Sequence, residues 1–309
     1  MAQRAPGQGL SRRAALAGLV GAASGASVGG LACRVPRDMS KQTGTSGQAP
    51  DVATPAGPAG PAGLAGLAGF CDGVPAIADA ERGQRCARAQ DALRAAGQHA
   101  LVAEAGATLE YFTGVPWPRS ERPLLLVLPA AGPPALVGPS FEAHTLRERS
   151  GELRLVLWSE HASPYARVAE LVAESGQPAP SLGLEPTTRM FVLEGLRRDL
   201  PGATLADGGP IVRACRSVKS PAELALLRRA NEATKAALRQ VATLVRADML
   251  EAELTELVLA AQLAAGLEQP WALVLFGSNA AFPHGTRGAR RLARGELVLV
   301  DCGAALHGY

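Results

Sequence analysis

The sequence predicts an α/β (α+β) protein with two domains, and three observations predict this class. Between residues 76 and 214, short apolar runs bounded by Gly and Pro alternate with helical segments, as in a sheet covered by helices. A long amphipathic helix then begins at Pro221, and a later apolar run over residues 297–300 leads into Asp301. With 47% hydrophobic and 19% charged residues, the 309-residue chain has the composition of a globular protein with a sizeable core.

Residues 1–32 have the pattern of an export signal. Two arginines, Arg12 and Arg13, precede an uncharged stretch of small residues, and such a pair before a weakly apolar segment resembles the twin-arginine class. A membrane anchor is the alternative, but the stretch is rich in Ala and Gly and weakly hydrophobic. We expect an exported protein, periplasmic or extracellular. Cleavage after Ala32 would leave Cys33 first, a candidate lipid anchor and membrane tether, although Leu31 lies one place from the usual lipoprotein-box position.

Residues 33–75 are expected to be a linker. They are rich in Gly, Pro, Ala, Ser and Thr, and glycine recurs at every third position from Gly57 to Gly69. Five such triplets are too few for a collagen helix. A flexible, partly extended tether is therefore predicted, carrying no chemistry.

The first folded domain is expected over residues 76–214. In order, the patterns predict a helix over 78–97, strands over 99–105, 123–129, 134–139 and 151–158, a helix over 163–176, a strand over 181–185 and a helix over 187–202. Ala87 and Leu93 should face inward on the first helix. His161 is expected at the surface or capping the next helix, and Glu121 and Arg122 are expected to form a local ion pair, not a catalytic site.

The second domain is expected over residues 215–309 and begins with two helices. Ser220 is a fitting N-cap, Pro221 suits the first helical position, and Glu223 completes a capping box. The predicted buried face of this first helix consists of Leu224, Leu227, Thr234, Leu238, Val241 and Val245. A second helix, over 251–265, uses Leu254, Leu257, Val258, Ala261 and Ala264 and ends at Gly266.

Cysteine usage and charge exclude several classes of function. The five cysteines, Cys33, Cys71, Cys86, Cys215 and Cys302, show no metal-site spacing and are an odd number, so scattered thiols are expected in place of a disulfide framework. The net charge of +3 comes without a basic stripe. No nucleic-acid partner is therefore expected.

Two residues near the end of the chain carry candidate chemistry. His284 stands in an Asn-Ala-Ala-x-Pro-His-Gly stretch, and Asp301 follows the buried run of residues 297–300. Carboxylate and imidazole groups are ligands for divalent transition metals, which lower the pKa of bound water. Two titratable residues do not by themselves define a site.

At these residues the sequence resembles the pita-bread metallopeptidases, the group of aminopeptidase P, prolidase, creatinase and methionine aminopeptidase. The resemblance is to the Xaa-Pro branch with a creatinase-type N-terminal domain, and it runs from about residue 80. It is carried by LEYFTGVPWPRSERPLLLVLP, VKSPAELALLRRANEAT, FGSNAAFPHG and LARGELVLVDCGAALHGY. It implies a creatinase-like N-terminal α/β domain followed by an incomplete pita-bread catalytic domain.

The resemblance also implies a site. Asp301 matches the first metal-ligating aspartate, and His284 matches the histidine that contacts substrate or assists proton transfer. The family holds two divalent ions (Mn, Co or Zn) with two Asp, one His and two Glu, and a metal-bridging hydroxide attacks the peptide carbonyl. The other ligands match nothing up to Tyr309, and His307 is expected to face solvent. The 309-residue chain is therefore expected to be a C-terminally truncated fragment that binds no metal pair and is inactive.

Several functions remain open at this point. The leading one is metal-dependent hydrolysis of Xaa-Pro bonds in proline-containing peptides, of aminopeptidase P or prolidase type, with homodimers or higher oligomers as in the relatives. A non-catalytic creatinase-like binding protein that has lost its metal site is the second. A creatine-type amidinohydrolase, which shares the fold but normally dispenses with metal, is the third.

Overall fold

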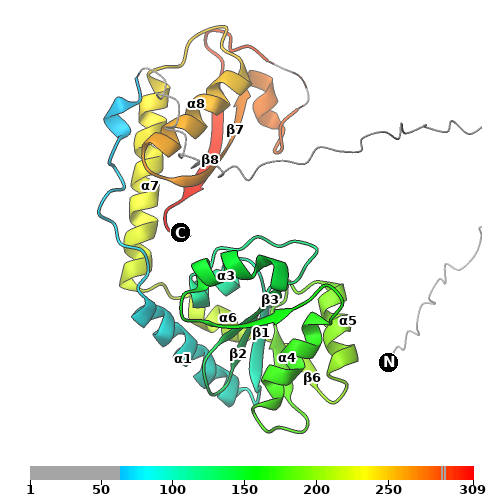
Figure 1. Ribbon diagram of the computed structural model, residues 1–309. Helices are drawn as coiled ribbons and strands as arrows, with labels where there is room; N and C mark the ends of the chain where they lie inside the picture. Colours follow the sequence, from blue (N-terminus) through cyan, green and yellow to red (C-terminus); the bar gives the residue numbers. More distant parts are fainter. Residues whose placement is uncertain (1–62, 287, 289) are drawn as a thin grey trace, which may run out of the picture. The chain divides into compact units, whose positions relative to one another are not determined.

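The computed structural model describes residues 63–286, 288 and 290–309 (Figure 1). The predicted export signal, Cys33 and most of the predicted linker lie outside these residues. Within the described part of the chain, none of the helices combines the length and the apolar character needed to cross a bilayer.

The first domain is built on a six-stranded sheet with the order β4-β3-β2-β1-β5-β6. Its strands are β1 (Ala100–Glu104), β2 (Leu125–Pro129), β3 (Ala135–Pro139), β4 (Arg154–Trp158), β5 (Ser181–Leu184) and β6 (Thr204–Asp207). Strand β2 runs antiparallel to β1 and β3, whereas β1, β5 and β6 run parallel, as do β3 and β4. Strands β1, β5 and β6 therefore place their carboxyl ends at one edge of the sheet.

Helices cover both faces of this sheet (Figure 1). One face packs against α1 (Asp79–Ala95), α2 (Ala107–Thr113), α3 (Ala143–Ser150) and α6 (Gly209–Arg216), and the other against α4 (Pro164–Ala173) and α5 (Met190–Asp199). A short 3-10 turn, η2 (Ser140–Glu142), precedes α3. Alternate strand residues divide between the two cores: Leu101 and Ala103 enter the first, and Ala100 and Val102 the second, because successive side chains of a strand point to opposite faces.

The predicted strands and helices of this domain are confirmed, with four omissions (α2, α3, α6 and β6) and one error. Helices α2, α3 and α6 are short, seven or eight residues each, too short for a clear apolar period. Strand β6 has exposed and half-exposed residues and so lacks an apolar run. Ala87 is exposed, and the buried residues of α1 are Arg85, Cys86, Ala89 and Leu93. The prediction for Leu93 is right and that for Ala87 is wrong, because Ala87 lies off the stripe of positions 86, 89 and 93.

The remaining described residues form two helices and a two-stranded antiparallel ribbon. Helix α7 (Pro221–Ala242) packs on α8 (Glu251–Ala264), and strand β7 (Glu268–Phe276) pairs with β8 (Val298–Ala305). The 3-10 turn η3 (Gly277–Ala281) opens the connection between the strands. One core joins helices and ribbon, and Figure 1 shows both strands beside α8.

The buried face of α7 differs from the predicted one. Leu224 is exposed, Leu227, Thr234 and Leu238 are half-buried, and only Val241 of the predicted helical positions is fully buried. The buried positions are Glu223, Leu226, Ala230, Ala233, Ala237 and Val241. Small alanines occupy the contact side because they allow close approach of another helix, whereas the prediction followed the large apolar residues. The capping box of Ser220 and Glu223 is confirmed.

Residues 63–74 do not behave as the predicted linker. They include the 3-10 turn η1 (Ala65–Leu67), and Leu64, Leu67 and Cys71 are buried in the same core as α7 and α8. The Gln240 amide and the Arg229 guanidinium donate to main-chain oxygens of this segment at Gly63 and Phe70. The prediction of a flexible tether is wrong for this stretch, because its leucines and Phe70 supply apolar surface that the helices bury.

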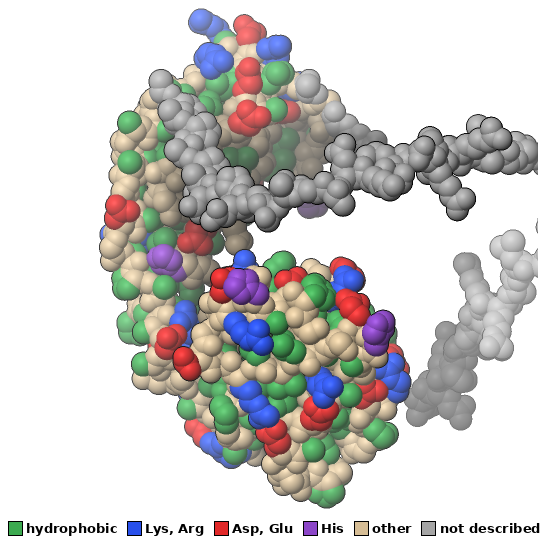
Figure 2. All heavy atoms as spheres, viewed as in Figure 1, with side chains coloured by type: hydrophobic (Ala, Val, Ile, Leu, Met, Phe, Trp, Pro, Cys, Tyr) green, Lys and Arg blue, Asp and Glu red, His purple; other side chains and the backbone are tan. Residues whose placement is uncertain are grey.

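The charged side chains are mixed over the surface. On the face seen in Figure 2, acidic and basic groups are interspersed and no single-sign patch stands out.

Of the cysteines in the described residues, Cys71, Cys86, Cys215 and Cys302 are all free thiols. Burial raises the pKa of all four, that of Cys86 to about 11, so none of them is a reactive thiolate at neutral pH.

Candidate functional site

Asp301 lies on the open face of the β7–β8 ribbon. Leu273 pairs directly with Asp301, and Leu275 with Leu299, and paired residues of an antiparallel ribbon share a face. The other face enters the core beneath the helices through Ala272, Val274, Phe276, Val298, Val300, Cys302 and Ala304. The predicted burial of the run 297–300 is wrong: Leu297 is exposed and Val298, Leu299 and Val300 are half-buried, because one face of the ribbon is open. The ribbon presents the Asp301 carboxylate to solvent.

His284 lies in the loop that folds back toward this face. The loop leaves β7 through η3, and its Gly285 stands against the ribbon: a Cβ there would lie 3.3 Å from Leu273 Cδ1 and 3.6 Å from Leu275 Cδ2. Since Leu273 is the cross-strand partner of Asp301, residue 285 lies on the face that carries Asp301. Because His284 directly precedes Gly285 in the sequence, it lies on the same side of the ribbon as Asp301. Both side chains are exposed.

The donor set does not fit a two-metal centre. In the described residues, nowhere do three or more His, Cys, Asp or Glu side chains gather closely enough to hold a metal ion. Asp301 supplies one carboxylate, and its neighbour Cys302 faces the core on the opposite side of the ribbon. A dinuclear site needs several carboxylates at close spacing, and the described residues do not supply them.

His307 is exposed, as predicted, and it is also tethered. It occupies the turn after β8 with a positive φ of 51°. Its Nε2 lies 3.1 Å from the Val74 carbonyl oxygen and its Nδ1 lies 3.7 Å from Glu268 Oε1. The ring therefore joins this turn to the segment before α1 and to the start of β7.

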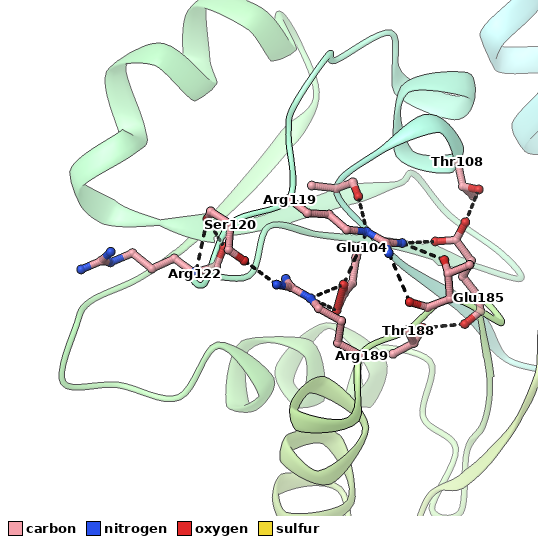
Figure 3. A network of polar contacts seen from close by, with 10 residues as sticks. Glu104, Thr108, Arg119, Ser120, Arg122, Glu185, Thr188 and Arg189 are labelled. Atoms are coloured by element: carbon pink, nitrogen blue, oxygen red, sulfur yellow. Dashed lines mark hydrogen bonds and ion pairs between the residues drawn. The ribbon is translucent and has the colours of Figure 1, made fainter. Parts of the chain in front are cut away.

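A second group of polar residues, the strand-end cluster, lies where β1 and β5 end (Figure 3). It consists of Glu104, Arg119, Glu185 and Arg189. Glu104 is only 2% exposed, and its Oε2 lies 2.9 Å from Arg189 Nε and 3.6 Å from Arg119 Nε. Glu185 Oε2 lies 3.3 Å from an Arg119 terminal nitrogen, and its Oε1 accepts a 2.6 Å hydrogen bond from the Thr108 hydroxyl.

The two arginines of the strand-end cluster also bind main-chain oxygens. Arg119 donates to Ala105 and Thr187, and Arg189 donates to Ser120. The two carboxylates therefore neutralise both guanidinium groups while these tie the loops at the sheet edge together. The cluster therefore has a structural role, because its charged groups pair with one another and with main-chain oxygens.

A third group, the junction cluster, connects α1 to α7. It consists of Glu81, Arg85, Ser220, Glu223 and Tyr309. Arg85 and Glu223 are 1% and 3% exposed. A terminal nitrogen of Arg85 lies 2.9 Å from Glu81 Oε1 and 3.5 Å from Glu223 Oε1, and its other terminal nitrogen donates to the Tyr111 carbonyl at 3.0 Å. Its guanidinium also lies over the Tyr111 ring, 4.2 Å from the centroid.

The junction cluster extends to the turn after β8. The Tyr309 hydroxyl donates to Glu223 Oε1 at 3.0 Å, and burial together with this hydrogen bond raises the pKa of Tyr309 to about 12. The Ser220 hydroxyl donates to Glu81 Oε1 at 2.7 Å. Burial alone would raise the pKa of Glu81, but the hydrogen bonds from Ser220 and Arg85 outweigh it and lower that pKa. These contacts join α1, the start of α7 and the end of the ribbon.

The sequence reasoning located Asp301, His284 and the Ser220–Glu223 cap but missed both clusters. Glu121 and Arg122, predicted as a local ion pair, do form one at 2.5 Å, and His161 is exposed, as predicted. The missed residues are mostly far apart in sequence: Glu104 and Arg189 are 85 positions apart. One signal was available, since Glu104 directly ends an apolar strand run, where a buried carboxylate requires a partner.

Comparisons with known proteins agree on one family. The family model described as Creatinase/Prolidase N-terminal domain matches residues 85–218, and the model described as Metallopeptidase family M24 matches residues 225–309. The first match ends at Val218 and the second begins at Ala225, so the boundary between them lies at the start of α7. The junction cluster therefore joins residues from both sides of the family's domain boundary.

Curated relatives with more than 30% identity include two that show the extent of the match. A Schizosaccharomyces pombe protein named "Uncharacterized peptidase C18A7.01" is 32% identical over 250 residues, 76% of this chain and 54% of its own length. "Probable dipeptidase PepE" of Mycobacterium tuberculosis is 31% identical over 224 residues, 71% of this chain and 59% of its own length. The chain thus spans somewhat more than half the length of these curated relatives.

Solved structures share the fold. The dipeptidase PepE from Mycobacterium ulcerans superposes with a TM-score of 0.66 at 28% identity, covering 74% of this chain and 62% of that one. A recombinant prolidase from Thermococcus sibiricus gives a TM-score of 0.65 at 24% identity, with the same coverage of 74% and 62%. The second likeness speaks for the fold alone.

Proposed function

Since this chain belongs to the pita-bread metallopeptidase family M24 and carries its creatinase/prolidase N-terminal domain, we propose that the protein it represents hydrolyses peptides. The proposed reaction is cleavage of Xaa-Pro bonds at the N-terminus of peptides, of aminopeptidase P or prolidase type. The observation that carries the proposal is the open face of the β7–β8 ribbon, which presents Asp301 beside the loop of His284.

Asp301 is proposed as a metal ligand and His284 as the residue that contacts substrate or moves a proton. Two divalent ions, Mn, Co or Zn, are the proposed cofactors of the complete enzyme. The described residues supply no cluster of three metal-binding side chains, so hydrolysis is not proposed for these 309 residues acting alone. The same observation favours the second candidate, a creatinase-like binding protein without catalysis.

One experiment separates the two candidates. The complete product of the gene encoding this chain is purified, loaded with Mn²⁺, and assayed for release of alanine from Ala-Pro and from Ala-Ala. Faster cleavage of Ala-Pro, abolished by Asp301→Asn and unaffected by Asp79→Asn, supports the peptidase. Asp79 is the control because its side chain is 97% exposed. Absence of hydrolysis and of metal binding supports the binding protein.

Export and assembly are proposed on the sequence alone. A twin-arginine-type signal over residues 1–32 would send the folded protein to the periplasm or the medium, with Cys33 as a candidate lipid anchor. Replacing Arg12 and Arg13 by lysine should retain the protein in the cytoplasm on cell fractionation. A homodimer or higher oligomer is proposed for the whole protein, and sedimentation equilibrium measures it.

A further inference from the structure

A cavity of about 810 Å³ lies beside the junction cluster. It is bordered by α2, the end of α6, residues 217–219, the start of β7 and the turn after β8. Its volume is in the range of small-molecule sites, about 300–1,000 Å³. Its lining combines apolar groups with many charged ones, and Ile77, Tyr111 and Leu227 are among the apolar ones. Such a site suits a small, charged organic molecule.

One part of the lining carries surplus positive charge. Arg213, Arg216 and Lys219 all border the cavity, and in the described part of the chain none of the three forms an ion pair with a carboxylate. Arg216 donates only a long 3.4 Å hydrogen bond to the Thr108 hydroxyl, and Lys219 donates to the Ser217 carbonyl at 3.1 Å. Three cations that are not neutralised by the protein attract an anionic group.

Another part of the lining carries carboxylates. Glu110 and Glu268 both border the cavity. Burial and then the charge of Glu268 raise the pKa of Glu110, against the smaller opposite effect of Arg82, so the two carboxylates repel each other. The turn after β8 lies directly against Glu110: Gly308 has a φ of 83°, and a Cβ there would collide with Glu110 Oε1. A cation bound between the two carboxylates would relieve their repulsion.

We propose that this cavity binds a short peptide with free termini, of two or three residues, as a zwitterion. Its carboxylate would face Arg213, Arg216 and Lys219, and its ammonium would face Glu110 and Glu268. The charge pattern supports a zwitterionic ligand by itself. The choice of a peptide over another zwitterion rests on the proposed function.

The proposed site is separate from Asp301. Ala305, which borders the cavity, is four residues further along β8 than Asp301, or about 13 Å at 3.3 Å per residue. A tripeptide, the longest ligand proposed, spans about 10–11 Å when extended. It cannot occupy the cavity and reach Asp301 at the same time, so the cavity is a peptide-binding site additional to the proposed catalytic one.

The test is calorimetric titration of the 309-residue chain with Ala-Ala, with N-acetyl-Ala-Ala-amide, and with acetate or inorganic phosphate. Binding is expected for Ala-Ala alone. The double variant Arg216→Gln/Lys219→Gln and the single variant Glu110→Gln should each weaken it roughly tenfold or more, since each removes a charge-assisted contact. Lys235→Gln, at an exposed position of α7 away from the cavity, is the matched control and should change nothing.

Three outcomes would overturn the proposal: equal binding of the free and blocked peptides, phosphate or acetate binding as tightly as Ala-Ala, or equal weakening by the control. Urea unfolding of every variant checks its fold, and Arg213→Gln, at an exposed position, replaces the double variant if that one fails to fold. The hydrolysis assay stays separate. Binding without hydrolysis in the complete protein would refute the proposed function only, and hydrolysis without cavity binding would refute this inference only.

Discussion

Replacing Arg85 by methionine should destabilise the protein by about 3–5 kcal/mol, the cost of leaving buried charge without its partner. The substitution keeps the length of the side chain but removes the guanidinium from between Glu81 and Glu223. At the observed 3.5 Å from Glu223, Coulomb's law with an effective dielectric constant of 20 gives an attraction of about 5 kcal/mol. Desolvation of the guanidinium offsets part of this, but Glu223 remains 3% exposed with its charge.

The assay is urea unfolding followed by circular dichroism at pH 7, with the m-value checked for constancy. Arg94→Met is the matched control: it lies on the same helix, its side chain is 53% exposed, and its partner Asp91 is 74% exposed. An exposed pair contributes less than about 1 kcal/mol. Both variants lose an ion pair and a hydrogen bond to a main-chain oxygen, but Arg85 is buried and has two carboxylate partners, whereas Arg94 is exposed and has one.

A double-mutant cycle sharpens the test. Glu223→Gln alone should cost less than Arg85→Met, because Arg85 keeps Glu81 at 2.9 Å. The double variant should be more stable than the sum of the single losses by about 1–3 kcal/mol, since it removes both buried charges. Additive losses, or equal effects of Arg85→Met and Arg94→Met, would refute the reasoning.

Three further predictions concern other buried polar groups. Glu104→Gln should lower the free energy of unfolding, measured in urea, by about 3 kcal/mol, because the buried carboxylate neutralises two arginines. Glu160→Gln, which removes the carboxylate of an exposed ion pair, is the control, and an equal effect of the two substitutions would contradict the prediction. Tyr309 has a pKa of about 12 in the folded state, against 10.0 for an unperturbed tyrosine. Between pH 10 and 12 only the unfolded state loses this proton, so the free energy of unfolding should fall by about 2 kcal/mol as the pH rises. The Tyr309→Phe variant should lack this part of the pH dependence, and identical pH profiles of the variant and the wild type would exclude the linkage. Gln262 is 0% exposed, and in the described part of the chain neither of its amide atoms has a hydrogen-bond partner. Gln262→Met removes this unpaired amide and should therefore raise the free energy of unfolding by about 1–3 kcal/mol. A loss of stability would show that the amide is hydrogen-bonded.

Local patterns were sufficient for the main elements of the fold. Strand β2 is an apolar run bounded by prolines, and α7 begins with a Ser-Pro-x-Glu cap; both signals act within a few residues. The buried face of α7 was mispredicted because large apolar residues were counted, whereas contact with α8 selects alanines. Burial depends on the neighbouring element, and a single helical pattern does not contain that information.

The candidate site divides in the same way. Asp301 and His284 could be identified from the sequence because each stands in a motif of consecutive residues. The shared face of Asp301 and residue 285 depends on the register that pairs Leu273 with Asp301, and a shift of one residue would turn the carboxylate into the core. Neither the strand register nor the position of the loop that carries His284 can be predicted from the spacing of neighbouring residues.

By itself, the sequence determined the α/β class, the position of most helices and strands, the capping box at Ser220 and the two motif residues. The tertiary structure alone decided that residues 63–74 are packed, that Glu104 joins Arg119 and Arg189, and that Arg85, Glu223 and Tyr309 meet in one buried cluster. The physical reason is range. Capping and periodicity act over one or two turns of chain, whereas a buried charge takes its partner from whichever segment the fold brings near.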